Sequence, residues 1–206
     1  MRRIFLARHG NRQDFVDPVW VDAAEERYDP PLSVDGFEQA RRLGVRLIGE
    51  GITAIVASPF LRTVQTAEQV NATLGVPLFL ETGFGEWLSG DSFTRMPRLG
   101  ALERAASVYP LLGVGAALAW PETSEQMRTR VQHTLERLLE RLGGTLLVVT
   151  HAASAAAAVL VDPRIARVEC PLCALFCLER DAAGWRLVLD ADVAHVGAPL
   201  ATFAFP

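Results

Sequence analysis

The chain has 206 residues, and half of them are hydrophobic. This length is sufficient for one sizeable core, so we expect a single domain over residues 1–206. The net charge of −4 and the lack of a basic run exclude a surface for nucleic acid or anionic membrane, because such surfaces need a basic stripe. All 20 basic residues are arginines, so one arginine alone says little about phosphate recognition.

The first half of the chain alternates predicted strands and helices. The apolar run 4–7 predicts a short buried strand, and a polar loop follows over residues 11–32. Ser33 is a helix cap, and the helix that it starts ends near Gly49 and Gly51.

The same alternation continues from residue 52. Residues 52–57 predict a second buried strand, and Ser58-Pro59 is typical of a helix start, with a cap followed by proline in the first helical position. This helix is predicted to end near Leu74, and residues 76–80 to form a third strand.

The pattern loosens over residues 88–121, which we interpret as a small insertion over the site with a weak helix at 99–108. Thr123 and Gln126 then form a predicted capping box for a helix that lasts until Gly143.

The last third of the chain completes the predicted sheet. Residues 146–150 form the most apolar strand, and residues 152–161 a helix of small side chains. Segments 172–178 and 185–189 predict a terminal hairpin. The expected fold is therefore α/β: a three-layer α/β/α sandwich with a mostly parallel sheet and a terminal antiparallel hairpin or edge strand.

Side chains that could take part in catalysis or bind an anion follow several of these strands. Arg8 and His9 end the first strand and His151 follows the fourth, while Arg62 lies one turn into a helix and Glu86 beyond the third strand. Ligands bind beyond the carboxyl ends of such strands, so these residues are expected to converge. Imidazole attacks phosphorus and guanidinium holds phosphate by two parallel hydrogen bonds, which indicates phosphoryl transfer.

Four motifs carry a family resemblance: Arg8-His9-Gly10, the segment 58–67 with Arg62, Glu86 between glycine and tryptophan, and Thr150-His151. In this order they resemble the histidine phosphatase superfamily, which is phosphoglycerate mutase-like, from residue 4 to about residue 160. The branch of the suppressor-of-T-cell-receptor-signalling phosphatases is the most similar one. That resemblance rests on Arg12, Asp14, Trp20 and the segment Asp29-Pro30-Pro31-Leu32.

The resemblance implies a mechanism without metal or other cofactor. His9 would be the neutral nucleophile, its second nitrogen donating to a backbone carbonyl, and Glu86 the general acid and then base. The phosphoryl group would be held by Arg8, Arg12, Arg62 and a protonated His151. Burial and nearby arginines pull the Glu86 pKa in opposite directions, and we expect an acidic, bell-shaped pH optimum.

The function expected from the resemblance is a phosphatase, that is, a phosphoric monoester hydrolase. One alternative is a phosphoglycerate-type mutase, which the lack of an arginine pair in residues 88–95 disfavours. The other is a catalytically silent module that binds a phosphorylated ligand. Residues 88–121 are mostly apolar, with cations only at Arg95, Arg98 and Arg104. A phosphorylated small molecule, or an aryl phosphate in particular, is the expected substrate.

The remaining candidate residues are expected to lie outside the site. Glu81 is the nearest competitor to Glu86, His133 is expected in solvent, and His195 is left outside the site. The three clustered cysteines, Cys170, Cys173 and Cys177, are interpreted as strand residues, with a zinc site as the open alternative. Their odd number favours a reducing cytoplasm, and no apolar run has the length of an export or membrane segment.

Overall fold

The computed structural model of the protein describes residues 2–100, 102, 108–197 and 202–205. The strands are β1 (Arg2–Arg8), β2 (Ile52–Ala57), β3 (Leu78–Leu80), β4 (Thr145–Thr150), β5 (Val168–Pro171), β6 (Leu175–Asp181), β7 (Gly184–Asp192) and β8 (Thr202–Phe205). The helices are α1 (Gln13–Val16), α2 (Trp20–Ala23), α3 (Val34–Arg46), α4 (Leu61–Leu74), α6 (Ser124–Arg141), α7 (Ala152–Val159) and the 3-10 helix η1 (Thr82–Phe84).

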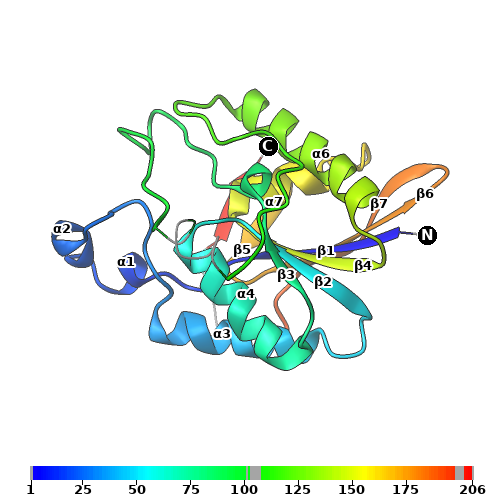
Figure 1. Cartoon of the computed structure of the whole chain (residues 1–206), viewed down its shortest axis with the longest axis horizontal. Helices are drawn as coiled ribbons and strands as arrows, with labels where there is room; N and C mark the ends of the chain where they lie inside the picture. Colours follow the sequence, from blue (N-terminus) through cyan, green and yellow to red (C-terminus); the bar gives the residue numbers. More distant parts are fainter. Residues whose placement is uncertain (1, 101, 103–107, 198–201, 206) are drawn as a thin grey trace.

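The main sheet has the strand order β3-β2-β4-β1-β6-β7 (Figure 1). Strands β3, β2, β4 and β1 run parallel to one another, whereas β6 pairs antiparallel with β1 and β7 antiparallel with β6. A second, two-stranded sheet joins β5 and β8. The expected parallel sheet with a terminal antiparallel hairpin is confirmed, and the parallel strands end at the same edge.

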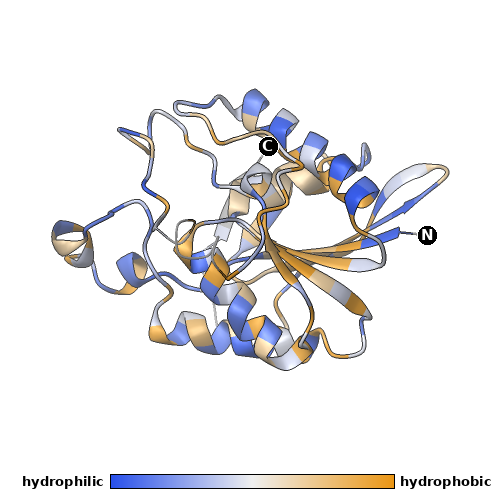
Figure 2. Ribbon diagram, in the orientation of Figure 1, coloured by the Kyte–Doolittle hydropathy of each residue, from blue (hydrophilic) through white to orange (hydrophobic). Residues whose placement is uncertain are grey.

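Alternate residues of the central strands face opposite cores. Leu6 and Val148 pack with apolar residues of α6 and α7, while Phe5 and Leu147 pack with those of α3 and α4. Figure 2 shows the apolar strands between helices whose hydrophilic residues face outward. This period of two follows from the pleat of a strand covered on both faces. The expected three-layer α/β/α arrangement is therefore confirmed.

Two of the three predicted helix caps are confirmed in detail. The Ser33 hydroxyl accepts the backbone N–H of Gly36, and Thr123 and Gln126 form a reciprocal capping box. The third prediction is wrong by two residues, because α4 begins at Leu61 rather than at Pro59.

The α4 start differs because its polar partners come from elsewhere in the chain. Phe60 is the cap residue and offers no side-chain acceptor, and Asp29 of the 11–32 loop accepts the Leu61 N–H at 2.7 Å. The Ser58 hydroxyl instead lies 2.8 Å from His151 Nε2. A residue interpreted as a helix cap thus belongs to the candidate site.

Smaller differences concern the ends of elements. The 11–32 loop contains the short helices α1 and α2, which stand out at one end of the molecule (Figure 1). The expected strand 172–178 begins only at Leu175, because Cys173 occupies a turn with φ +57°. The weak helix expected at 99–108 falls largely outside the described residues.

Among the described residues, no helix combines the length and the apolar character needed to cross a membrane.

Candidate active site

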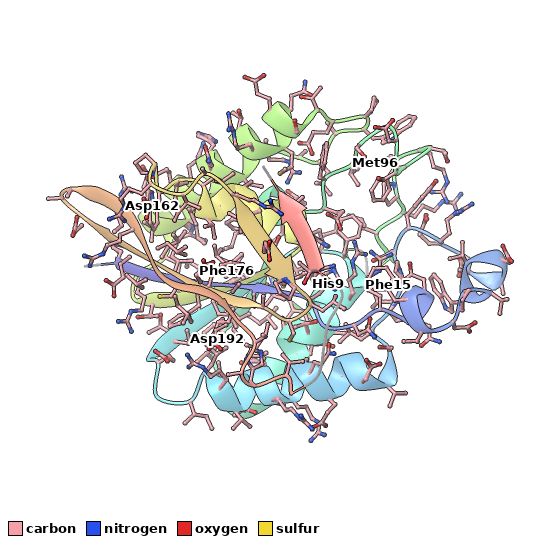
Figure 3. The ribbon with its side chains drawn as sticks, turned by 180° about the vertical axis from the view of Figure 1, so that it is seen from behind. His9, Phe15, Met96, Asp162, Phe176 and Asp192 are labelled. Carbon is pink, nitrogen blue, oxygen red and sulfur yellow. The ribbon has the colours of Figure 1, made fainter. Side chains whose placement is uncertain are left out.

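A cavity of about 320 Å³ lies at the carboxyl ends of β1 and β4. Its cationic side chains are Arg8, Arg12, Arg27 and Arg62, and its aromatic side chains are Phe15, Tyr28, Trp87 and Phe93. His9 and Glu86 also line it, together with Ser89, Ser92 and the first two residues of α7. His9 and Phe15 are labelled in Figure 3 and lie at this end of the sheet.

His9 is held by backbone and ring contacts directly after β1. Its N–H donates to the Thr150 carbonyl at 3.0 Å, and its own carbonyl accepts the Cys173 N–H at 3.1 Å. Its ring Nδ1 lies 2.8 Å from the Gly10 carbonyl oxygen, which can only accept, so Nδ1 carries the proton. The lone pair of the neutral ring is therefore on Nε2.

The electrostatic environment keeps His9 neutral. Burial, followed by the charges of Arg62 and Arg8, lowers the pKa of His9 well below the ordinary histidine value. A neutral imidazole with a fixed tautomer is the form that can act as a nucleophile.

Gly10 has a steric reason to be glycine. A Cβ at this position would lie 2.5 Å from the backbone oxygen of Gly36, at the start of α3. The Gly10 N–H also donates to Thr66 Oγ1 of α4 at 3.2 Å. The turn after His9 is thus fitted closely between α3 and α4.

Arg62 is a buried cation with donors left for a ligand. Its side chain is 1% exposed, its Nη2 donates to Glu86 Oε2 at 3.1 Å, and its Nη1 lies 3.7 Å from Asp29 Oδ1. Its Nε and Nη1 have no hydrogen-bond partner among the described residues. Burial lowers its pKa to about 10, so it stays charged at neutral pH. Buried unpaired donors on a charged group favour an anionic ligand.

Glu86 lines the cavity and contacts His151, which lies behind it and does not line the cavity. Glu86 Oε2 lies 3.2 Å from His151 Nδ1, and Oε1 accepts the Trp87 N–H at 3.1 Å. Burial would raise the Glu86 pKa, but His151 and Arg62 outweigh burial and hold that pKa well below its ordinary value. The negative charge of the carboxylate favours the tautomer with the proton on Nδ1, which has no hydrogen-bond partner of good geometry among the described residues. In this tautomer, Nε2 accepts from the Ser58 hydroxyl.

Burial and the charge of Arg62 lower the pKa of His151 to about 4, against the opposing effect of Glu86. With the protein's own charges alone, the imidazole is therefore neutral at physiological pH. The expectation that His151 is protonated beside a phosphoryl group stays a prediction.

Arg8 and Arg12 both line the cavity but differ in their partners. Arg8 is buried and donates to the Cys170 carbonyl oxygen at 2.6 Å. Arg12 is partly exposed, forms a two-pronged ion pair with Asp14 and lies over the Phe15 ring, 4.3 Å from its centre. Asp14 thus already offsets the charge of Arg12, which the sequence did not predict.

Glu81, the nearest competitor of Glu86, has a structural position. Its side chain is fully buried and accepts the backbone N–H groups of Gly83, Val114 and Gly115. It does not line the cavity. Of the two carboxylates, Glu86 is the one placed beside His9.

The other histidines and the cysteines lie outside the cavity. His133 is exposed on α6, and His195 Nε2 lies 3.0 Å from the Cys173 carbonyl oxygen. All three cysteines are buried and free, and burial raises the pKa of Cys170 to about 12. They form no metal-ligand group in the described part of the chain. Cys170 and Cys177 lie in strands as predicted, whereas Cys173 lies in a turn.

His9, Glu86 and His151 could in geometry hold a metal ion, because one ligand atom from each lies within 4.8 Å of the others. The surrounding charges argue against it. Arg62 donates to the same Glu86 oxygen that would bind the ion, and Arg8 lines the same cavity. A site with these guanidinium groups favours an anion over a cation.

Sequence reasoning missed two polar contacts and the aromatic lining. Ser58 and Asp29 belong to segments that carry the family resemblance, but nothing in the sequence indicated that Ser58 contacts His151 or that Asp29 contacts the start of α4. Phe15, Tyr28 and Phe93 come from loops without periodicity, so no pattern marked them.

Comparison with known proteins places this geometry in a family. A model of the histidine phosphatase superfamily (branch 1) matches residues 4–193. The chain is 30% identical over 175 residues to the transcription factor tau 55 kDa subunit of Saccharomyces cerevisiae, a match that covers 73% of this chain but only 38% of that relative. It is 27% identical over 216 residues to the probable phosphoglycerate mutase GpmB of Enterobacter sp., covering 97% of each.

Solved structures share the fold at low identity. Bacillus stearothermophilus YhfR has a TM-score of 0.69 at 20% identity, covering 95% of this chain and all of that one. A mycobacterial glucosyl-3-phosphoglycerate phosphatase has a TM-score of 0.66 at 20% identity, covering 93% and 100%. The finer assignment to the suppressor-of-T-cell-receptor-signalling branch stays a prediction. Because the family model spans nearly the whole chain, this protein belongs to the histidine phosphatase superfamily.

Proposed function

We propose that the protein hydrolyses phosphomonoesters through a phosphohistidine formed on His9. One observation carries this proposal: the His9 tautomer is fixed by the Gly10 carbonyl, and the buried guanidinium of Arg62 lines the same cavity with donors to spare. A nucleophile beside an unsatisfied anion site is the arrangement that phosphoryl transfer requires.

In the first step, Nε2 of His9 forms a bond to phosphorus while the bond from phosphorus to the leaving oxygen breaks. Arg8 and Arg62 bind the equatorial oxygens, where charge accumulates in a loose transition state. Arg12 joins them if its pair with Asp14 opens. Glu86, protonated beside the incoming dianion, gives its proton to the leaving oxygen.

In the second step, the Glu86 carboxylate takes a proton from a water molecule. The water oxygen forms a bond to phosphorus and the bond from phosphorus to His9 Nε2 breaks, which restores the neutral imidazole. The His151 ring, whose Nδ1 lies 3.2 Å from Glu86 Oε2, stays beside the carboxyl group through both steps.

The substrate class that fits the cavity best is an aryl phosphate. Phe15, Tyr28, Trp87 and Phe93 give it aromatic walls, and its volume of about 320 Å³ suits a small flat group. Residues 88–121 contribute Ser89, Ser92 and Phe93, which supports their proposed role as a specificity segment. Among the described arginines of this segment, Arg95 pairs with Glu26 outside the cavity.

A phosphoglycerate mutase is the second candidate, supported by the end-to-end similarity to the GpmB relative. A mutase would need further cations for the substrate carboxylate. Among the described residues, the one additional cation that lines the cavity is Arg27, which lies over the Tyr28 ring. Conversion of 3-phosphoglycerate to 2-phosphoglycerate without phosphate release would favour the mutase.

Release of phosphate from p-nitrophenyl phosphate tests the proposal. The wild type should turn over in the presence of a chelator, and His9→Ala should abolish turnover. His133→Ala removes an exposed histidine and serves as the matched control, with activity unchanged. Failure of the wild type to turn over at any acidic pH would indicate a ligand-binding module instead. Loss of turnover on chelation would refute the metal-free mechanism.

A further inference from the structure

The short segment 83–86, which carries Glu86, is held by a buried arginine of the neighbouring helix α6. Arg130 is 5% exposed and donates to three carbonyl oxygens of the segment. The distances are 2.9 Å to Gly83, 3.3 Å to Gly85 and 3.3 Å to Glu86. A side chain distant in sequence thus satisfies the backbone on both sides of the carboxylate residue.

Glu122 completes the contacts of Arg130. Its two carboxylate oxygens accept Nε at 2.8 Å and Nη2 at 2.7 Å. With the three carbonyls this makes five hydrogen bonds, which equals the number of N–H donors in a guanidinium group. Glu122 also binds the two residues that directly follow the segment, since its carbonyl accepts Trp87 Nε1 and its N–H donates to the Leu88 carbonyl.

Two further donors, from the β4–α7 side, contact the one remaining carbonyl of the segment and the Gly85 carbonyl a second time. Thr150 Oγ1 donates to the Phe84 carbonyl oxygen and Ser154 Oγ to the Gly85 carbonyl oxygen, both at 2.6 Å. Thr150 directly precedes His151, the partner of the Glu86 carboxylate. The segment is therefore tied to α6 on one side and to the His151 strand end on the other.

The segment needs such external support. It begins within the single turn η1, and Gly83 allows it to approach α6 closely, because a Cβ on Gly83 would lie 2.1 Å from Thr134 Oγ1. A buried ion pair with no exposed carboxylate or guanidinium is a costly way to gain stability alone. Its five fixed bonds are better suited to setting the position of a backbone.

We propose that Arg130, oriented by Glu122, is a positioning residue that fixes the carboxylate of Glu86 for proton transfer. This inference rests on the proposed role of Glu86 as acid and base. Arg130 does not line the cavity, so it acts through the backbone of residues 83–86 rather than on the substrate.

The test compares kcat/KM for phenyl phosphate, whose leaving oxygen needs a proton, with that for p-nitrophenyl phosphate, whose leaving oxygen does not. In Arg130→Lys, one ammonium group cannot replace the five hydrogen bonds of the guanidinium group. We therefore expect kcat/KM for phenyl phosphate to fall about 10- to 100-fold. The value for p-nitrophenyl phosphate should fall less than about threefold. The double variant Glu122→Gln/Arg130→Met removes both buried charges together, so no unpaired charge is left in the core and the chain should still fold. It should show the same dependence on the leaving group as Arg130→Lys.

Asp162→Asn is the matched control. Asp162 is a buried carboxylate that accepts hydrogen bonds from Arg164 and the Leu187 N–H, and it does not line the cavity. This variant should lower the melting temperature without changing the ratio of the two substrates. In a Glu86→Gln background, Arg130→Lys should cause no further change in that ratio.

Equal losses for both substrates, or a full additional loss in the Glu86→Gln background, would overturn the positioning role and leave Arg130 merely structural. Failure of the proposed function is separately visible in chains that keep Arg130. The wild type would then form no phosphohistidine, and Glu86→Gln would not change the dependence on the leaving group.

Discussion

The floor and the rim of the cavity are built differently. On the floor, His9 directly follows β1 and Arg62 lies in the first turn of α4, and both are almost fully buried, as is His151 behind Glu86. On the rim, the 11–32 and 88–121 loops meet through exposed contacts, such as Tyr28 Oη with Thr94 Oγ1 at 2.8 Å. The floor therefore fixes the reacting groups, while the rim is free to define what the phosphate is attached to.

The largest effect is expected from the floor cation Arg62. Arg62→Ala should lower kcat for p-nitrophenyl phosphate by about 10³-fold or more, because the transferring phosphoryl group loses its buried counter-charge. Arg62→Lys should recover little of this, since an ammonium cannot offer two parallel donors. Steady-state kinetics with Arg41→Ala, an exposed arginine of α3, give the control. Recovery by lysine to near wild-type rates would contradict bidentate binding.

Glu86→Gln should have a smaller effect that depends on the leaving group. We expect kcat/KM for phenyl phosphate to fall about 10²-fold and that for p-nitrophenyl phosphate to fall far less, because only the former needs a proton. A series of substituted phenyl phosphates gives the slope of log(kcat/KM) against the pKa of the leaving phenol. The same slope in Glu86→Gln and in the wild type would remove Glu86 from the proton-transfer role.

The pH dependence of kcat/KM should show an acidic optimum for phenyl phosphate. The pKa of His9 is well below its ordinary value, so the nucleophile stays neutral as the pH falls. The pKa of Glu86 is also low, so its acid form is depleted as the pH rises. Activity should therefore decline toward alkaline pH, and Glu86→Gln should abolish that decline. A wild-type kcat/KM that does not change from weakly acid to alkaline pH would contradict the expected decline.

The smallest effect is expected at the rim. Tyr28→Ala removes an aromatic wall that packs on Phe93, with ring centres 5.0 Å apart, and should raise KM for phenyl phosphate by about 10-fold with little change in kcat. Inorganic phosphate should still inhibit with an unchanged constant. A kcat loss as large as that of a floor variant would erase the distinction between the two regions.

The floor was largely predictable from the sequence and its supports were not. His9, Arg62, Glu86 and His151 follow predicted strands, and the topology brings strand ends together. The contacts between Ser58 and His151, or Arg130 and the 83–86 segment, join residues far apart in the chain. No local period or spacing encodes such pairs.

The charge state of His151 illustrates a further limit. Its place at a strand end was predictable, but its pKa depends on complete burial and on the position of Arg62. Both are known only once the packing is known. The aromatic rim was unpredictable for a different reason, because loops 11–32 and 88–121 have no periodicity to interpret.

The most direct test of the central claim is detection of the covalent intermediate. Rapid acid-free quenching during turnover of p-nitrophenyl phosphate, followed by peptide mass spectrometry, should find one phosphoryl group on His9. It should accumulate in Glu86→Gln, whose second step lacks a base, and be absent from His9→Ala. Turnover with no phosphohistidine in the wild type or in Glu86→Gln, or with the phosphoryl group on another residue, would contradict the mechanism.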